Sequence, residues 1–157
     1  SWNGTVFERL GDQHLNMFIL SATLPGMPLI YSGQEAGLSH RLSFFGKDEI
    51  DWSSKELLPF YTKMLALKHE NSALWNGIWG GDFKRIDCAE EGIYSFSRQA
   101  KGNEVIVYLN LGAEDQTIDL KAFANLQDYT DHPFGDGVAV VDGILSLPAA
   151  SAFVLTK

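Results

Sequence analysis

A carboxylate that directly follows a short apolar run is the first candidate for chemistry in this chain. Residues 26–35 read Gly-Met-Pro-Leu-Ile-Tyr-Ser-Gly-Gln-Glu, so Glu35 lies just beyond the run. A run this short and apolar, closed by Gly33, predicts a strand over residues 27–32 that is buried on both faces. In a (β/α) barrel the carboxyl ends of the strands form the face where chemistry takes place. We therefore expect Glu35 at such a face, with Tyr31 packed in the barrel.

Two helices are expected to hold this strand in place. A capping-box pattern at residues 5–8 opens the first, whose apolar stripe continues to Ala22 and which stops before Pro25. The second helix follows a polar and aromatic loop over residues 34–52, and Pro59 predicts a late start or a kink in it.

The second half of the chain has the pattern of short strands joined by tight turns. Alternation over residues 93–97, a turn at 101–103 and an apolar run at 105–109 predict one hairpin. The pair Asp142-Gly143 between two further apolar runs predicts a second hairpin, and residues 152–155 a closing strand. Several short strands at this spacing indicate a small antiparallel β-sandwich.

The pattern G-x-P-x-I-Y-x-G-x-E at residues 26–35 closely resembles the eighth barrel strand of the α-amylase family of glycoside hydrolases. Residues 1–5, Ser-Trp-Asn-Gly-Thr, are similar to the sequence just after that family's seventh strand. The resemblance implies an α/β segment, the last helix-strand-helix of a (β/α)8 barrel, over residues 1–79. An all-β antiparallel sandwich, the family's C-terminal domain, would follow over residues 80–157.

The resemblance also implies roles for individual residues. Glu35, Tyr31 and Gly33 would support the barrel mouth without reacting. For Glu35 the alternatives are direct sugar contact or plain solvent exposure. For Tyr31 core packing is favoured over ligand contact. Flat apolar faces and fork-like donors suit pyranose rings and their hydroxyls. The candidate sugar-contacting residues are Trp2, Asn3, His40, Arg41, Phe45 and Trp52. In the alternative interpretation the aromatic residues of the loop only anchor it to the barrel.

No catalytic residue is expected within this chain. Retaining glycosidases need two carboxylates about 5 Å apart, and the family takes its three from the fourth, fifth and seventh strands, all upstream of Ser1. The triplet Arg85-Ile86-Asp87 imitates the family's nucleophile motif G-x-R-x-D, but Phe83 stands where the motif has Gly. It also follows the eighth strand, whereas the motif precedes the fifth. We expect a sandwich strand there.

The sequence predicts no cofactor and no metal in this chain; calcium is an expectation for an intact parent only. The four histidines have no metal-ligand spacing, Cys88 is the single cysteine, and the acidic residues between 128 and 136 lack an EF-hand pattern. Twelve basic against twenty acidic residues, a net charge of −8, argue against nucleic acid as a partner. The longest apolar runs, at 17–20 and 27–31, are too short to span a membrane.

The resemblance implies that the chain is the C-terminal fragment of an α-amylase-like hydrolase of α-glucans. The parent would cleave α-glucosidic bonds with retention, and the fragment alone would be inactive. The alternatives are the tail of a related transglycosylase or sugar isomerase, or of a non-catalytic barrel scaffold. The expected partners are an α-glucan or maltooligosaccharide, the N-terminal part of the barrel, and other copies of the fragment. The sequence does not identify the cellular compartment of the protein; we favour a secreted or periplasmic protein over a cytoplasmic one.

Overall fold

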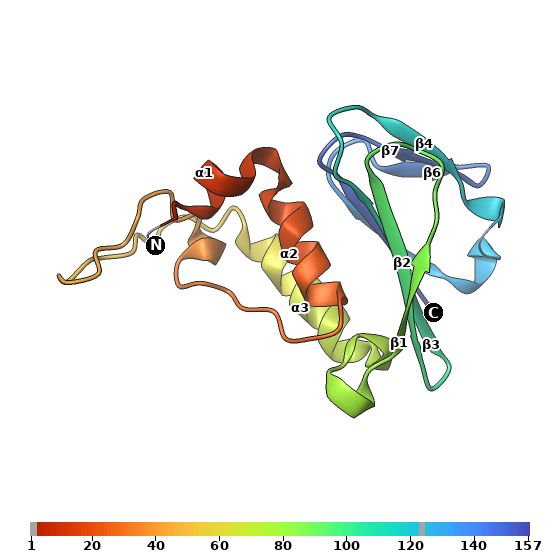
Figure 1. Ribbon diagram of the computed structural model, residues 1–157, viewed down its shortest axis with the longest axis horizontal. Coiled ribbons are helices and arrows are strands. Elements are labelled where there is room, and N and C mark those ends of the chain that lie inside the picture. Colours follow the sequence, from red (N-terminus) through yellow and green to blue (C-terminus); the bar gives the residue numbers. More distant parts are fainter. Residues whose placement is uncertain (1–2, 123–124) are drawn as a thin grey trace.

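A helical layer covers one face of a β-sandwich in the computed structural model, which describes residues 3–122 and 125–157 (Figure 1). The helices are α1 (Val6–Leu10), α2 (His14–Thr23) and α3 (Leu58–Glu70). Short 3-10 turns are η1 (Gly11–Gln13), η2 (Gln34–Ala36), η3 (Ser72–Leu74), η4 (Gly77–Trp79), η5 (Leu120–Ala122) and η6 (Leu126–Asp128).

The strands form two antiparallel sheets. They are β1 (Asp82–Ile86), β2 (Ile93–Ala100), β3 (Asn103–Asn110), β4 (Gln116–Asp119), β5 (Thr130–Phe134), β6 (Ala139–Val141), β7 (Ile144–Leu147) and β8 (Ala152–Thr156). One sheet has the order β1-β2-β3-β8-β5 and the other β4-β7-β6. The predicted antiparallel sandwich is therefore confirmed, and the closing strand lies inside the larger sheet.

The larger sheet is buried on both of its faces, which explains the continuous apolar run in β3. Val105, Val107 and Leu109 pack in one cluster with residues of α2 and α3. Ile106 and Tyr108, which alternate with them, pack in a second cluster against the smaller sheet. The helices thus share a core with the sandwich.

Both predicted hairpins form, and each closes through a two-residue turn. Lys101 and Gly102 have φ of +53° and +85°, and Asp142 and Gly143 have φ of +51° and +80°. Positive φ at both central residues is the geometry whose twist matches the flanking strands. These two turns set the pairing of β2 with β3 and of β6 with β7.

The predicted first helix is interrupted. Gly11 adopts a φ of +52° and ends α1, and the η1 turn separates it from α2. The capping box at Thr5 is present as expected. α3 begins at Leu58 with Pro59 in its first turn, which confirms the late start.

The predicted strand over residues 27–32 is wrong for this chain. The segment belongs to neither sheet, and Met27 and Leu29 are each 81% exposed. A strand needs hydrogen-bonding neighbours, and none of the described strands lies beside this segment. In Figure 1 the loop that follows, around residues 40–52, projects away from the sandwich.

Candidate functional site

The turn that follows the extended segment is built on Gly33. Its φ is +88°, and a Cβ atom at this position would lie 2.8 Å from Cγ2 of Ile50. The Tyr31 amide donates to Oε1 of Gln34 at 3.2 Å, and the Gln34 amide donates to the Tyr31 carbonyl at 2.9 Å. This double link fixes the turn and starts η2, which carries Glu35.

The carboxylate of Glu35 acts on the phenol of Tyr61 in α3 through its charge. The Oε2 atom of Glu35 and the phenol oxygen of Tyr61 are buried without a hydrogen-bond partner among the described residues. Burial is the largest cause that raises the pKa of Tyr61; the neighbouring Gln34 side chain lowers this pKa, and the charge of Glu35 raises it. Buried polar atoms without partners are rare in folded proteins. This pair therefore needs an explanation.

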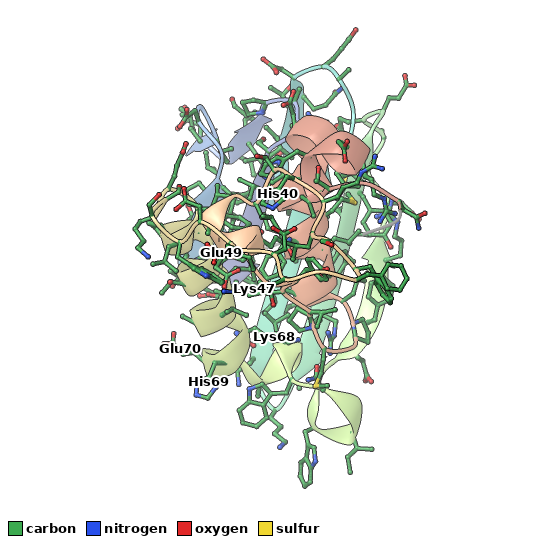
Figure 2. All side chains as sticks on the ribbon, turned by 90° about the vertical axis from the view of Figure 1, so that its left-hand side faces the viewer. His40, Lys47, Glu49, Lys68, His69 and Glu70 are labelled. Carbon is green, nitrogen blue, oxygen red and sulfur yellow. The ribbon has the colours of Figure 1, made fainter. Side chains whose placement is uncertain are left out.

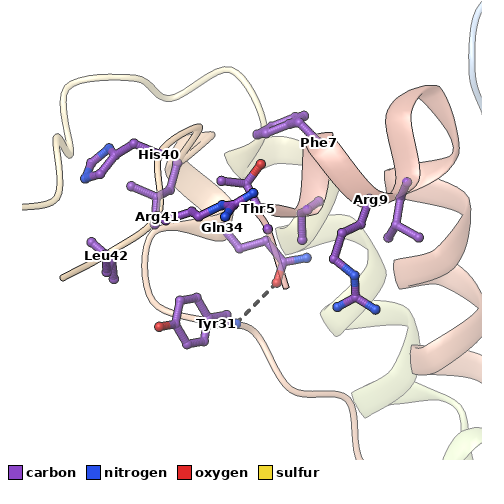
Figure 3. A pocket seen from close by; sticks show the side chains of 12 residues that line it. Thr5, Phe7, Arg9, Tyr31, Gln34, His40, Arg41 and Leu42 are labelled. Atoms are coloured by element: carbon purple, nitrogen blue, oxygen red, sulfur yellow. Dashed lines mark hydrogen bonds between the residues drawn. The ribbon is translucent and has the colours of Figure 1, made fainter. Parts of the chain in front are cut away.

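Three of the predicted residues meet at a cavity of about 300 Å³ between α1 and the loop (Figure 3). Tyr31, His40 and Arg41 line it. Its other lining residues are Gly4, Thr5, Val6, Phe7, Arg9, Leu10, Gln34, Leu38 and Leu42. The cavity therefore combines apolar walls with guanidinium, amide and phenol groups, a set of donors suited to hydroxyls.

Arg41 is fixed by an ion pair with Glu8 of α1. Its Nε and Nη2 atoms donate to the two carboxylate oxygens of Glu8 at 3.2 Å each. The Thr5 amide also donates to Glu8, at 2.7 Å. The hydrogen bond from the Thr5 backbone is the largest cause that lowers the pKa of Glu8, followed by that from Arg41. Glu8 is thus held as an anion and is unsuited to act as a general acid.

The remaining candidates lie outside this cavity. Phe45 is 90% and Trp52 49% exposed. His40, which lines the cavity, also faces Asp48, with 3.6 Å between His40 Nε2 and the carboxylate. Asn3 is exposed. Trp2 falls outside the described residues. The structure therefore brings Tyr31, His40 and Arg41 together and leaves the other loop aromatics at the surface.

The described lining of the cavity includes no carboxylate, so it holds no pair of acid and nucleophile. Arg85, in the imitation nucleophile motif, donates from Nη1 to the Ser95 carbonyl and lies 4.0 Å from the Tyr94 ring centre. It is a strand residue of β1, as expected. Within the described ranges, no three His, Cys, Asp or Glu side chains are grouped as metal ligands.

One cluster was not predicted from the sequence. A second hollow of about 470 Å³, here called the aromatic hollow, lies where α3 ends. Its lining residues are Leu65, Lys68, His69, Trp75, Asn76 and Trp79. The signal available in the sequence was the pair of tryptophans in Leu-Trp-Asn-Gly-Ile-Trp at residues 74–79, in a stretch between the second helix and the first strand.

In the part of the chain that is described, no helix has the length and apolar character required to cross a membrane.

The family model for the cyclo-malto-dextrinase C-terminal domain matches residues 88–133. The chain is 28% identical over 140 residues to the α-amylase MalA of Haloarcula japonica, covering 81% of this chain and 20% of that protein. It is 29% identical over 110 residues to neopullulanase 2 of Thermoactinomyces vulgaris, covering 66% of this chain and 18% of that protein.

Solved structures agree on the fold. A debranching enzyme from Nostoc punctiforme superposes with a TM-score of 0.69 at 19% identity, over 94% of this chain and 32% of that one. A cyclic α-maltosyl-(1→6)-maltose hydrolase from Arthrobacter globiformis gives 0.69 at 19% identity, over 97% and 31%. The chain therefore spans about a fifth of the curated relatives above. The comparisons confirm that it resembles the C-terminal portion of α-amylase-family glycoside hydrolases.

Proposed function

We propose that this chain is the C-terminal portion of an α-glucan hydrolase. In this proposal residues 1–79 complete a (β/α)8 barrel, and residues 80–157 form the β-domain behind it. The carboxylates that cleave the glucosidic bond with retention come from polypeptide outside these 157 residues. The chain contributes the donors at the cavity lined by Tyr31, His40 and Arg41, and is itself inert.

The observation that carries the proposal is an apolar segment that is extended but belongs to no sheet. Met27 and Leu29 are each 81% exposed, although an apolar side chain gains roughly 1.5–3 kcal/mol on burial. Leu58 and Leu65 of α3 are also exposed, at 43% and 38%. In an intact barrel, parallel strands on both sides of residues 27–32 would pair the backbone, and elements packed on the faces of that sheet would cover Met27 and Leu29.

Unpaired buried polar atoms in the helical half of the chain support the proposal. The Oε2 atom of Glu35, the phenol of Tyr61 and the Nε2 atom of His14 are all buried without a hydrogen-bond partner among the described residues. Such atoms cost free energy unless another group pairs with them. Neighbouring barrel segments would supply those groups, and Glu35 would then support the barrel mouth without reacting.

The proposal is tested by comparing the 157-residue chain with the polypeptide extended at its N-terminus by the sequence encoded upstream. Each is incubated with soluble starch, and reducing ends are assayed with and without a calcium chelator. We expect turnover only for the extended protein. Turnover by the chain alone, well above a blank, would overturn the assignment. An extended protein that binds starch but releases no reducing ends would indicate a scaffold, and one that forms new glucosidic linkages a transferase.

Exposed apolar side chains also favour self-association of the isolated chain. Sedimentation velocity measures this directly, and we expect a concentration-dependent dimer or larger species that disappears when the N-terminal extension is present. A strictly monomeric chain would contradict the expectation.

A further inference from the structure

The aromatic hollow is separate from the cavity of Figure 3 and shares no lining residue with it. Figure 2 shows Lys68 and His69 at one end of α3, with His40 toward the other end of the helical side. The hollow is formed where α3 gives way to η3 and η4, just before β1.

Two indole rings are held at the surface without being buried. Trp75 is 41% and Trp79 is 61% exposed. The indole N–H of Trp75 donates to the His69 carbonyl at 3.0 Å, which fixes that ring. The Nζ atom of Lys101 lies 5.8 Å from the Trp75 ring centre and 5.4 Å from that of Trp79. The ammonium of Lys101, in the turn between β2 and β3, thus lies within cation–π range of both rings.

Asn76, which follows Trp75 in the sequence, lines the same hollow as the two tryptophans. The Oδ1 atom of Asn76 is buried and has no partner among the described residues. Asn76 stands at the N-cap position of η4, yet its side chain makes no capping hydrogen bond. The fold therefore makes no use of this oxygen, although leaving a buried acceptor unpaired costs free energy.

The lysine in the lining of the hollow is already engaged. Lys68 donates to the carbonyls of Ala22, Gly26 and Leu74 at 3.0, 3.2 and 2.7 Å. A lone acceptor oxygen disfavours an anion, and a purely apolar partner would leave that oxygen unpaired. A ligand that fits has a flat apolar face and neutral hydroxyl donors at its edge.

We propose that the aromatic hollow is a binding site for the pyranose rings of an α-linked glucose oligosaccharide. A ring lies with its C–H face on Trp79, and its hydroxyls face the polar side chain of Asn76 in the lining. The lining of the hollow indicates a sugar as the ligand. The identification of that sugar as an α-glucan rests on the proposed function. The hollow contains no catalytic group and binds without cleavage.

The test uses the full 157-residue chain, whose backbone amides are followed by NMR during titration with maltoheptaose. We expect shifts centred on residues 74–80 and on Lys101. The Trp79→Ala variant should bind about tenfold more weakly, equivalent to about 1.4 kcal/mol. Asn76→Ala should weaken binding by a smaller factor. The control is Val141→Ala, since Val141 is 65% exposed on β6 and lies outside the hollow; it should bind as the unaltered chain does.

Three results would overturn the inference. The first is a Trp79→Ala variant that keeps its fold by circular dichroism and binds maltoheptaose with unchanged affinity. The second is a set of amide shifts confined to the residues of the Figure 3 cavity. The third is a dimer that dissociates in Trp79→Ala, in a chain whose amides do not respond to the sugar. Equal affinity for cellohexaose would overturn the α-linked assignment. Because this binding needs no turnover, an extended protein without starch hydrolysis would refute the proposed function and leave the binding result unaffected.

Discussion

Arg98 of β2 donates from Nη1 to the carbonyl of Thr23, the last residue of α2, over 2.9 Å. The same guanidinium donates to the carbonyls of Gly81 and Trp75 at 2.9 and 3.2 Å. Arg98 is only 2% exposed. Carbonyls at a helix C-terminus lack intrahelical partners and carry partial negative charge. One buried cation therefore joins the helical layer to the sheet.

We expect Arg98→Leu to lower the free energy of unfolding by about 3 kcal/mol, because three carbonyls lose a charged donor. Urea unfolding followed by circular dichroism measures the loss. Lys47→Ala is the control, since the side chain of Lys47 is 86% exposed and pairs with Glu49 at the surface. Its effect should stay within about 0.5 kcal/mol. Equal midpoints for both variants would show that Arg98 does not join the two layers.

Lys68 gives the fold a pH dependence at alkaline pH. Burial, followed by repulsion from Arg98, lowers the pKa of Lys68 from 10.5 to about 8. The folded chain thus releases this proton near pH 8, whereas the unfolded chain keeps it until about 10.5. Unfolding takes up a proton between these values, so the contribution of Lys68 to stability rises with pH from about 8 upward.

The measurement is the difference in unfolding free energy between the unaltered chain and Lys68→Met at pH 7, 8, 9 and 9.5. This difference should be constant below pH 8 and then move in favour of the unaltered chain. The slope should be smaller than about 1.4 kcal/mol per pH unit, because Lys68 is partly solvated. A difference that stays flat up to pH 9.5 would contradict the lowered pKa.

Gly33→Ala should destabilise the turn before η2, since Ala would combine a φ of +88° with a Cβ atom 2.8 Å from Ile50. A residue forced into such a conformation costs about 1–3 kcal/mol. Exchange of the Leu38 amide, which donates to the Gly33 carbonyl at 2.9 Å, reports on the turn. Gly37→Ala is the matched control: its φ is +75° and nothing lies within 4 Å of its added Cβ. If hydrogen exchange of the Leu38 amide is no faster in Gly33→Ala than in Gly37→Ala, the clash between the added Cβ atom and Ile50 is excluded.

Glu35→Gln should lower the pKa of Tyr61, because the charge of Glu35 opposes ionisation of the phenol. The pKa should nevertheless remain above 10, since burial is the larger cause. Ultraviolet absorbance of the ionised phenol during alkaline titration measures it, with Tyr61→Phe to assign the signal. Glu49→Gln, at a side chain that is 84% exposed, should change nothing. No shift in Glu35→Gln would place the two groups further apart than the structure does.

The sequence alone determined the local elements of the β half. The turns at residues 101–102 and 142–143 need only a pair of residues that tolerate positive φ, and strands of alternating or apolar pattern follow on each side. The capping box at Thr5 and the start of α3 near Pro59 were predictable for the same reason. In each case the residues that decide the geometry are neighbours in the chain.

Tertiary structure decided the features that depend on distant partners. Residues 27–32 have the pattern of a buried strand, but a strand forms only beside other strands, and Leu29 stays exposed here. Arg98 has the pattern of a surface residue in an alternating strand, yet carbonyls from three other segments converge on it and bury it. The grouping of Trp75, Asn76 and Trp79 into a hollow likewise depends on where α3 ends against the sheet. A local pattern fixes which face a residue presents, and only the packed chain supplies what that face meets.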